Sequence, residues 1–216
     1  MIEVIFFDLG NVILPFNHFQ IAEKLSRFSR RKGLEDPSRI FSYLFDFESG
    51  AVNGFDTGKV SPAQFFQSVR TDLDLSLSFE EFVPIWTNIF TEDEDVADVI
   101  RLLKRRCRLG LLSNTDPLHF GFIRSKFPVV SVFEKWILSF EVGFKKPHLR
   151  IFQKAIEWAS ASPEKILLID DLEKNVEAAL SVGMRGIHFR SAAQMKEELA
   201  FRFGFSGVNR VPQSRP

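Results

Sequence analysis

The sequence predicts an α/β protein, with a doubly wound, mainly parallel sheet and an inserted helical subdomain. Three observations support this fold class. Short apolar runs end in polar residues, segments with helical spacing alternate with these runs, and one long stretch near the start has helical periodicity without a buried strand. Such alternation implies right-handed crossovers, which place helices on both faces of the sheet.

Three apolar runs are the strongest strand candidates. Each is followed by a polar residue: residues 4–7 by Asp8, residues 109–112 by Ser113, and residues 166–169 by Asp170. Continuous rather than alternating hydrophobicity is typical of strands that are buried on both faces. Residues 136–139 and 186–189 are weaker candidates of the same kind.

Helical segments separate these strand candidates. Apolar spacing and helix-start signals predict helices at residues 93–106, 116–127, 147–159, 172–182 and 193–203. In a sheet of this kind, the ligand site lies outside the carboxyl ends of the strands. The residues that directly follow each strand are therefore the first candidates for function.

The stretch from residue 16 to residue 90 interrupts the alternation. Helical periodicities occur at residues 19–31, 37–47, 62–69 and 79–89, and the turn signals Gly50, Asn53-Gly54 and Gly58 predict a flexible connection. We predict a core domain of residues 1–15 and 91–205, with a helical cap subdomain of residues 16–90. Residues 206–216 lack periodicity and combine proline, serine and arginine, so we expect a disordered tail.

The overall charge excludes some classes of partner. Lys plus Arg equals Asp plus Glu at 28 each among 216 residues, so no global attraction to nucleic acid or to an anionic membrane is expected. The start does not resemble a signal peptide, and no run approaches the roughly 20 apolar residues of a membrane span. The single cysteine, Cys107, cannot form an internal disulfide, and a reducing cytoplasm is the predicted location. The oligomeric state does not follow from the sequence.

Polar side chains converge at the predicted sheet edge. Because parallel strands share their carboxyl edge, we expect Asp8, Ser113, Asp170 and Asp171 to gather in one crevice. Three carboxylates placed together repel and raise one another's pKa unless a cation lies among them, and oxygen ligands favour magnesium over zinc. The sequence therefore predicts a Mg²⁺ site.

Two further segments add groups suited to an anion. Asp116 followed by Pro117 predicts a helix start just after Ser113, and amides at such a start bind phosphate oxygens. Lys145 and Lys146 place positive charge just before another helix start. Each feature alone is explained by a helix cap or a solvated turn, but their joint occurrence indicates phosphoryl transfer.

With these residues in view, the chain resembles the haloacid dehalogenase superfamily. Four segments resemble its four motifs in the expected order: Phe6-Phe7-Asp8-Leu9-Gly10-Asn11-Val12-Ile13, Leu111-Leu112-Ser113-Asn114-Thr115, Lys146-Pro147, and Leu168-Ile169-Asp170-Asp171-Leu172-Glu173-Lys174-Asn175. The resemblance runs from Ile2 to about Phe189, and the helical insert is similar to the type I cap of this superfamily. It implies a Rossmann-like core.

The resemblance also implies roles for particular residues. Asp8 is the nucleophile that attacks phosphorus, and Asp8, Asp170 and the backbone carbonyl of Gly10 hold Mg²⁺, with Asp171 as an outer or alternate ligand. Ser113 and the Asn114 amide bind the phosphate of a small phosphorylated substrate. Lys146 steadies nucleophile and phosphate; Lys145 is the alternative, but the lysine directly before proline fits the pattern.

Gly10 departs from the family pattern. Most phosphatases of this superfamily carry a second aspartate there, which protonates the leaving oxygen and later activates water, and such acid–base catalysis is typically worth about 10²–10⁴-fold. Leaving groups of lower pKa, such as an anomeric hydroxyl, need less protonation. Residues 8–13 resemble the bacterial alpha-D-glucose-1-phosphate phosphatase subgroup, which has the same glycine, and Gly58-Lys59-Val60-Ser61 with Phe65 resembles its cap. The expected substrates are sugar phosphates such as glucose 1-phosphate.

Two other functions stay open at this point. A dehalogenase would use the same aspartate on carbon without a metal, and a phosphate-binding module would keep the pocket but lack turnover because of Gly10. Three histidines lie near the predicted crevice. We expect His18 to be a solvated linker residue, although it is also a candidate substitute acid, and we expect surface positions for His119 and His148.

Overall fold

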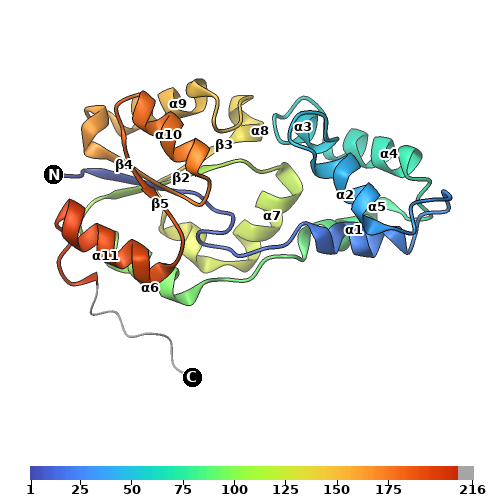
Figure 1. The fold of residues 1–216 in the computed structure, drawn as a ribbon, viewed down its shortest axis with the longest axis horizontal. Coiled ribbons are helices and arrows are strands. Elements are labelled where there is room, and N and C mark those ends of the chain that lie inside the picture. The colour runs from blue at the N-terminus through green and yellow to red at the C-terminus, as the bar shows by residue number, and fades with distance from the viewer. Residues whose placement is uncertain (209–216) are drawn as a thin grey trace.

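The computed structural model describes residues 1–208, and within them the strands form a five-stranded parallel sheet in the order β3-β2-β1-β4-β5 (Figure 1). The strands are β1 (Val4–Phe7), β2 (Arg108–Ser113), β3 (Lys135–Leu138), β4 (Ile166–Asp170) and β5 (Arg185–His188). The predicted fold class is confirmed, and both weaker strand candidates are strands. In the central register, Phe7 pairs with Leu111 of β2 and with Ile169 of β4, so the residue after β1 lies between the ends of its two neighbours.

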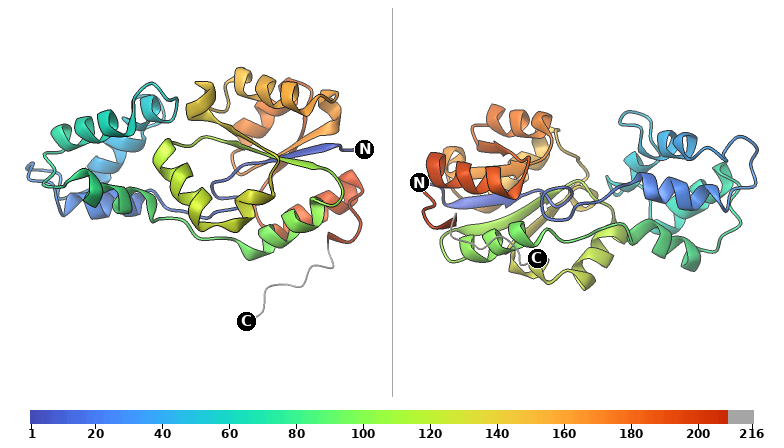
Figure 2. Two further views of the ribbon diagram at one scale, coloured as in Figure 1. Left: turned by 180° about the vertical axis from the view of Figure 1, so that it is seen from behind. Right: turned by 60° about the horizontal axis from the view of Figure 1, so that its bottom comes forward.

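Helices cover both faces of the sheet because alternate residues of each buried strand point to opposite sides. Phe6 and Leu168 pack in one apolar cluster with α9 (Leu149–Ala159) and α10 (Glu173–Ser181), whereas Phe7 and Ile169 belong to the other cluster. The helices of that second face are α6 (Glu94–Leu103), α7 (Pro117–Lys126) and α11 (Ala192–Phe203). Figures 1 and 2 show the two layers with the sheet between them. Short helical segments complete the core: η1 (Pro128–Val132), α8 (Ser139–Val142) and η2 (Pro163–Lys165).

The inserted stretch forms a separate group of helices at one end of the molecule (Figure 1). They are α1 (Phe19–Ser26), α2 (Pro37–Phe45), α3 (Val52–Phe55), α4 (Pro62–Asp72) and α5 (Phe79–Thr87). Ser61 and Ser78 begin α4 and α5 with complete capping boxes, which satisfy the first backbone amides of each helix. Aromatic side chains, among them Phe55, Phe82 and Trp86, fill the interior of this group. The two connecting segments pair with each other at Phe16 and Phe90.

Two segments that the sequence predicts to be irregular contain ordered residues. The predicted flexible connection contains α3, because Val52 and Phe55 bury their side chains on one helical face, with Asn53 and Gly54 between them. The first residues of the predicted disordered tail are also packed: Val208 is buried, and the Arg106 guanidinium donates to the Ser206 carbonyl at 2.6 Å. Residues 209–216, the rest of that tail, lie outside the described residues. None of the helices in residues 1–208 combines the length and the apolar character needed to cross a membrane.

Candidate active site

Three carboxylates meet where β1 and β4 end, as the sequence predicts. One oxygen from each of Asp8, Asp170 and Asp171 can be chosen so that all three lie within 4.8 Å of one another. Asp170 is the last residue of β4, and Asp8 directly follows the adjacent β1, so the parallel pairing of the two strands brings them together. The Asp8 and Asp170 side chains are buried, and Asp171 is partly exposed.

Lys146 is the cation of this cluster. Its Nζ lies 2.9 Å from Asp8 Oδ1 and 2.6 Å from Asp170 Oδ2, and the residue is 1% exposed. Its backbone is held by the side chain of Asn114, whose Oδ1 accepts from Lys146 N at 2.7 Å and whose Nδ2 donates to Lys146 O at 2.9 Å. The sequence did not indicate this positioning role, because it depends on two loops that are 32 residues apart.

Lys145 points to a different part of the molecule. Its Nζ donates to Asn53 Oδ1 of the inserted helices and lies 3.6 Å from Asp56 Oδ2. Of the two adjacent lysines, Lys146 therefore contacts the carboxylate cluster and Lys145 connects the core to the insert.

The hydrogen bonds of the aspartates leave particular oxygens available. Asp170 Oδ1 accepts from Leu172 N at 3.0 Å and from Asn175 Nδ2 at 2.9 Å, while its Oδ2 faces Lys146. Asp8 receives its bonds from Leu9 N, at 2.7 Å, and from Lys146 at the same oxygen, Oδ1. Its second oxygen is thus the one suited to attack or to bind a cation.

Electrostatics within the cluster favour an additional positive charge. Burial raises the pKa of Asp8 to about 7, and the charges of Asp170 and Asp171 add to this rise while Lys146 opposes it. Burial also raises the pKa of Asp171, as does Asp170. Burial alone would lower the pKa of Lys146, but Asp170 and Asp8 raise it, so the ammonium stays charged. One ammonium against three carboxylates leaves excess negative charge.

The residues present fit a hard divalent cation. The converging donors are oxygens, which Mg²⁺ prefers, and the set contains no histidine or cysteine that would indicate zinc. A second observation agrees: Asn175 Oδ1, beside Asp170, is a buried acceptor with no donor among the described residues. Such an atom is suited to accept a hydrogen bond from a water that the cation carries.

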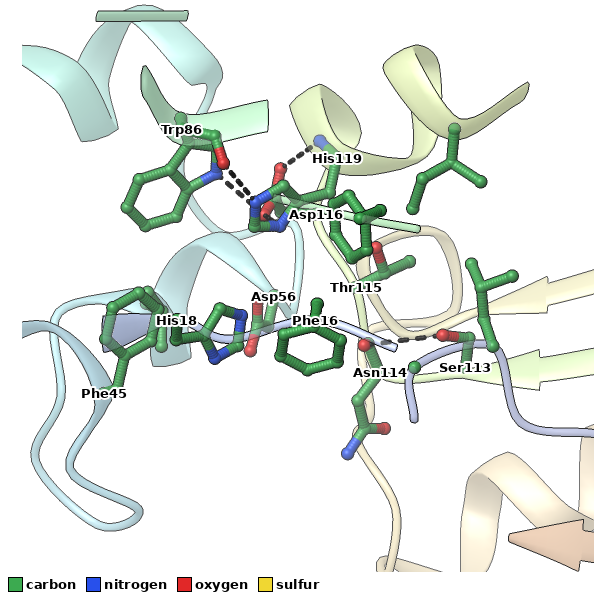
Figure 3. A pocket seen from close by; sticks show the side chains of 15 residues that line it. Phe16, His18, Phe45, Asp56, Trp86, Ser113, Asn114, Thr115, Asp116 and His119 are labelled. Atoms are coloured by element: carbon green, nitrogen blue, oxygen red, sulfur yellow. Dashed lines mark hydrogen bonds and ion pairs between the residues drawn. The ribbon is translucent and has the colours of Figure 1, made fainter. Parts of the chain in front are cut away.

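A pocket lies between the core and the inserted helices (Figure 3), and its lining includes Leu9, which follows Asp8, and Asn114, which bonds to the Lys146 backbone. From the core it is lined by Gly10, Ser113 and Asn114, and from the insert by residues that include Asp56 and Trp86. Ser113 ends β2 and is buried, and its hydroxyl makes only a long contact of 3.5 Å with Asn114 O. The hydroxyl is therefore placed to donate to a ligand in the pocket.

The side-chain space at Gly10 is already filled. A Cβ built on Gly10 would lie 2.5 Å from the ring atom Cε1 of Phe16. A tight turn after β1 produces this approach: Leu9 O accepts from both Ile13 N and Leu14 N. Any side chain at position 10 would therefore require Phe16 to move.

His119 is buried, so its predicted surface position was wrong. Its Nδ1 lies 2.6 Å from Asp116 Oδ2, its Nε2 contacts Trp86 O at 2.8 Å, and Trp86 Nε1 donates to the same Asp116 oxygen at 3.1 Å. The signal that the sequence analysis missed is the spacing of Asp116 and His119, which are three residues apart at a helix start. This polar network joins α5 of the insert to α7 of the core.

The other two histidines differ from each other. His18 was expected to be a solvated linker residue, but its ring lines the pocket and stacks on Phe45 with a centroid distance of 4.2 Å. Burial, and the nearby charge of His119, lower the pKa of His18 to about 3. His148 is exposed, as expected, and caps α9 by accepting from Arg150 N.

The buried pair of Asp116 and His119 predicts a pH-dependent stability. Burial opposes ionisation of both groups, but the attraction between their charges outweighs burial. The pKa of Asp116 is therefore lowered below its ordinary 3.8, and the pKa of His119 is raised above its ordinary 6.5. We expect His119→Gln to reduce the free energy of unfolding by about 3 kcal/mol between pH 4 and 6.5. The difference should shrink as pH rises through the raised His119 pKa, and also as pH falls below 3.8.

Urea denaturation of both proteins at a series of pH values from 5 to 9 measures this difference. A difference that stays constant over the range, or grows with pH, would contradict the assignment of a charged pair.

Comparison with known proteins identifies relatives over most of the chain. Residues 2–183 match the model of a family described as haloacid dehalogenase-like hydrolase. The chain is 26% identical to a D-ribitol-5-phosphate phosphatase of Bacteroides thetaiotaomicron, with 92% of this chain and 97% of that protein covered. It is 27% identical to a glyceraldehyde 3-phosphate phosphatase of Pyrococcus abyssi, with 88% and 82% covered.

A solved structure has the same fold. It is that of a HAD family enzyme from Bacteroides thetaiotaomicron in complex with magnesium and inorganic phosphate, at a TM-score of 0.77. The superposition covers 88% of this chain and 95% of the other, with 24% sequence identity.

Proposed function

We propose that this chain, which belongs to the haloacid dehalogenase-like hydrolase family, is a Mg²⁺-dependent phosphatase of small phosphorylated metabolites. The proposed reaction passes through an aspartyl-phosphate on Asp8. The observation that carries this proposal is the cluster itself: carboxylate oxygens of Asp8, Asp170 and Asp171 within 4.8 Å, with the Lys146 ammonium bonded to two of the three side chains. The two relatives named as phosphatases of ribitol 5-phosphate and glyceraldehyde 3-phosphate support the same reaction.

In the proposed first step, the free oxygen of Asp8 attacks phosphorus, an O–P bond forms, and the bond to the leaving-group oxygen breaks. Lys146 keeps Asp8 oriented and ionised by bonding to its other oxygen. The Ser113 hydroxyl and the backbone amide of Asn114 bind phosphoryl oxygens. Water then attacks phosphorus, releases inorganic phosphate and restores the Asp8 carboxylate.

The cation site uses residues of the same cluster. Asp8, Asp170 and the backbone carbonyl of Gly10 would hold Mg²⁺, with Asp171 as an outer or alternate ligand. When bound, the cation supplies positive charge against the phosphoryl oxygens. The fit rests on the oxygen donors, the excess negative charge and the unpaired Asn175 Oδ1.

The substrate class is proposed as sugar phosphates. The pocket combines aromatic walls, among them Phe45 and Trp86, with polar atoms of His18 and Asp56, which suits the carbon face and the hydroxyls of a small polyol or sugar. The two named relatives act on phosphates of a sugar alcohol and of a triose. A sugar 1-phosphate such as glucose 1-phosphate, expected from the resemblance at residues 8–13, stays a prediction within this class.

Residues 16–90 are proposed to act as a cap that opens for the substrate and closes over the reacting phosphate. Contacts between α5 and α7 through Trp86 and His119 support a closed arrangement that excludes water. A cytoplasmic location and the absence of nucleic acid or membrane partners also stay predictions.

One other function has a specific observation in its favour. Gly10 has no carboxyl group and Phe16 fills the space beside it, which would suit a phosphate-binding module without turnover. A dehalogenase is disfavoured because a metal-free site would leave the Asp170 and Asp171 charges against a single ammonium.

A panel of phosphorylated metabolites, assayed for inorganic phosphate with Mg²⁺ and then with excess chelator, tests the proposal. We expect turnover of sugar and polyol phosphates that chelation abolishes and added Mg²⁺ restores. Binding of phosphate analogues without turnover of any panel member would favour the binding module. Halide release from haloacids in the presence of chelator would favour the dehalogenase.

A further inference from the structure

The proposed reaction needs a proton donor that position 10 does not supply. The leaving oxygen of an alkyl phosphate must be protonated as its bond to phosphorus breaks, and the attacking water must later lose a proton. Gly10 offers no titratable atom, and the Phe16 ring occupies the space where a side chain would lie. A titratable group elsewhere in the same pocket is the candidate for handling this proton.

Three of the four titratable side chains that line the pocket in the described part of the chain are unsuited to this task. Asp116 and His119 bond to each other, and both also bond to Trp86. The remaining Asp116 oxygen accepts from the first amides of α7. His18 is kept neutral by burial, which lowers its pKa to about 3, so it holds no acidic proton at neutral pH.

Asp56 is the fourth, and it enters the pocket from the insert. Its carboxyl group is about one-fifth exposed and is seen in Figure 3 between the rings of His18 and Phe16, while Gly10, Ser113 and Asn114 line the core side of the same pocket. Lys145 Nζ lies 3.6 Å from Asp56 Oδ2, and within residues 1–208 this is the one ion pair that Asp56 makes. The carboxyl group therefore keeps an oxygen for the ligand.

The loop that carries Asp56 is held close to the core. Gly58 has a φ of +67°, and a Cβ at this position would lie 2.1 Å from the Phe140 carbonyl oxygen of α8, so only glycine permits this approach. Lys145 also donates to Asn53, one turn before Asp56. These contacts hold the loop of Asp56 against the core, beside the pocket that Asp56 lines.

The surroundings of Asp56 suit a group that exchanges protons near neutrality. Burial raises its pKa to about 6, the nearby charge of Asp116 adds to the rise, and Lys145 and His119 oppose it. An acid whose pKa lies near the working pH is present in both protonation states. Such a group can donate a proton in one step and accept one in the next.

We propose that Asp56 supplies the general acid and base that Gly10 lacks. This inference rests on the proposed phosphatase function. In the first step the Asp56 carboxyl gives its proton to the leaving oxygen while Asp8 bonds to phosphorus, and the alcohol departs. In the second step the Asp56 carboxylate takes a proton from water as the water oxygen bonds to phosphorus, the Asp8–phosphorus bond breaks, and Asp56 is protonated again.

Asp56→Asn, which keeps the size of the side chain but cannot donate or accept that proton, tests the proposal. With a sugar phosphate we expect kcat to fall about 10²–10⁴-fold. With p-nitrophenyl phosphate, whose leaving group needs no protonation, the first step should survive and the second should not. The variant should then release one nitrophenolate per enzyme in a burst and accumulate phosphorylated Asp8, which mass spectrometry detects.

Lys145→Met is the matched control, because it breaks the same contact between loop and core but keeps the carboxyl group. If Asp56 only holds the loop in place, Asp56→Asn and Lys145→Met should behave alike. In both variants KM would rise, rates would fall equally for all leaving groups, and no burst would appear. That result would overturn the proposal. If Asp56 is the acid, Lys145→Met should instead show no burst and shift the pH dependence of kcat/KM to higher pH, since an ammonium that lowers the Asp56 pKa is lost.

A rescue experiment further distinguishes a role of Asp56 in proton transfer from a role in holding the loop. Adding Gly10→Asp and Phe16→Ala to Asp56→Asn restores a carboxyl group at position 10 together with the space for it. Recovery of turnover on alkyl phosphates supports the proposal, and unchanged rates in the triple variant count against it. Absence of turnover in the wild-type enzyme on every substrate would instead refute the phosphatase function itself, which separates the two failures.

Discussion

Replacing Asp8 with asparagine is expected to lower the rate of phosphate release at least about 10³-fold while the protein stays folded. The amide keeps the shape of the side chain and can still accept from Leu9 N, but it cannot form the aspartyl-phosphate. Because burial raises the pKa of Asp8, the folded state disfavours its charge, so a neutral side chain should cost little stability. Phosphate release under saturating substrate and Mg²⁺, together with urea denaturation, measures both quantities.

The matched control for this variant is Asp171→Asn, which removes a charge from the same cluster at its partly exposed side. We expect it to weaken Mg²⁺ binding and to retain measurable turnover when Mg²⁺ is raised. Turnover of Asp8→Asn within tenfold of the wild type would refute Asp8 as the nucleophile.

Replacing Lys146 with methionine is expected to destabilise the fold by about 3–5 kcal/mol and to abolish turnover. The Lys146 ammonium is the one buried cation that bonds to Asp8 and Asp170 in the described structure, so its loss leaves two buried carboxylates without compensation. If the same carboxylates also bind Mg²⁺, the cation should stabilise the variant more than it stabilises the wild type. Thermal unfolding with and without Mg²⁺ measures this difference.

Lys145→Met is the control for stability, because the two lysines are neighbours in the chain with different contacts. Its partly exposed pair with Asp56 should contribute only about 1 kcal/mol. Mg²⁺ should stabilise this control as it stabilises the wild type. Equal stabilisation of Lys146→Met and wild type by Mg²⁺ would argue against a shared cation and lysine site.

Much of the fold followed from local patterns in the sequence. Continuous apolar runs predicted the strands, including the two weaker candidates, because a strand covered on both faces has no polar side to reveal. Helix starts such as Asp116-Pro117 were also predicted correctly, since capping depends on residues close in sequence. The error at residues 50–58 has the opposite cause: Asn53 and Gly54 favour turns, but burial of Val52 and Phe55 outweighs that preference.

The candidate site likewise has features that the sequence predicted and features that it did not. The meeting of Asp8 with Asp170 was predictable, since a general rule of parallel sheets places the ends of adjacent strands together. The burial of His119 was not, because it depends on Trp86 of a helix that is 33 residues away. The spacing of Asp116 and His119 indicates that the two can pair, but nothing local indicates that Trp86 covers them.

By itself, the sequence determined the order of strands and helices, the helical insert and the acidic residues at one sheet edge, because each depends on hydrophobic period or on position at the end of an element. Only the tertiary structure decided which lysine bonds to Asp8, that Phe16 fills the space at Gly10, and that Asp56 enters the pocket from the insert. The physical reason is that each contact joins segments far apart in sequence: Lys146 and Asp8 meet within the core, whereas Phe16 and Asp56 reach the site from the insert. Such contacts depend on how distant segments pack together, and that geometry is set by packing across many residues rather than by any one segment.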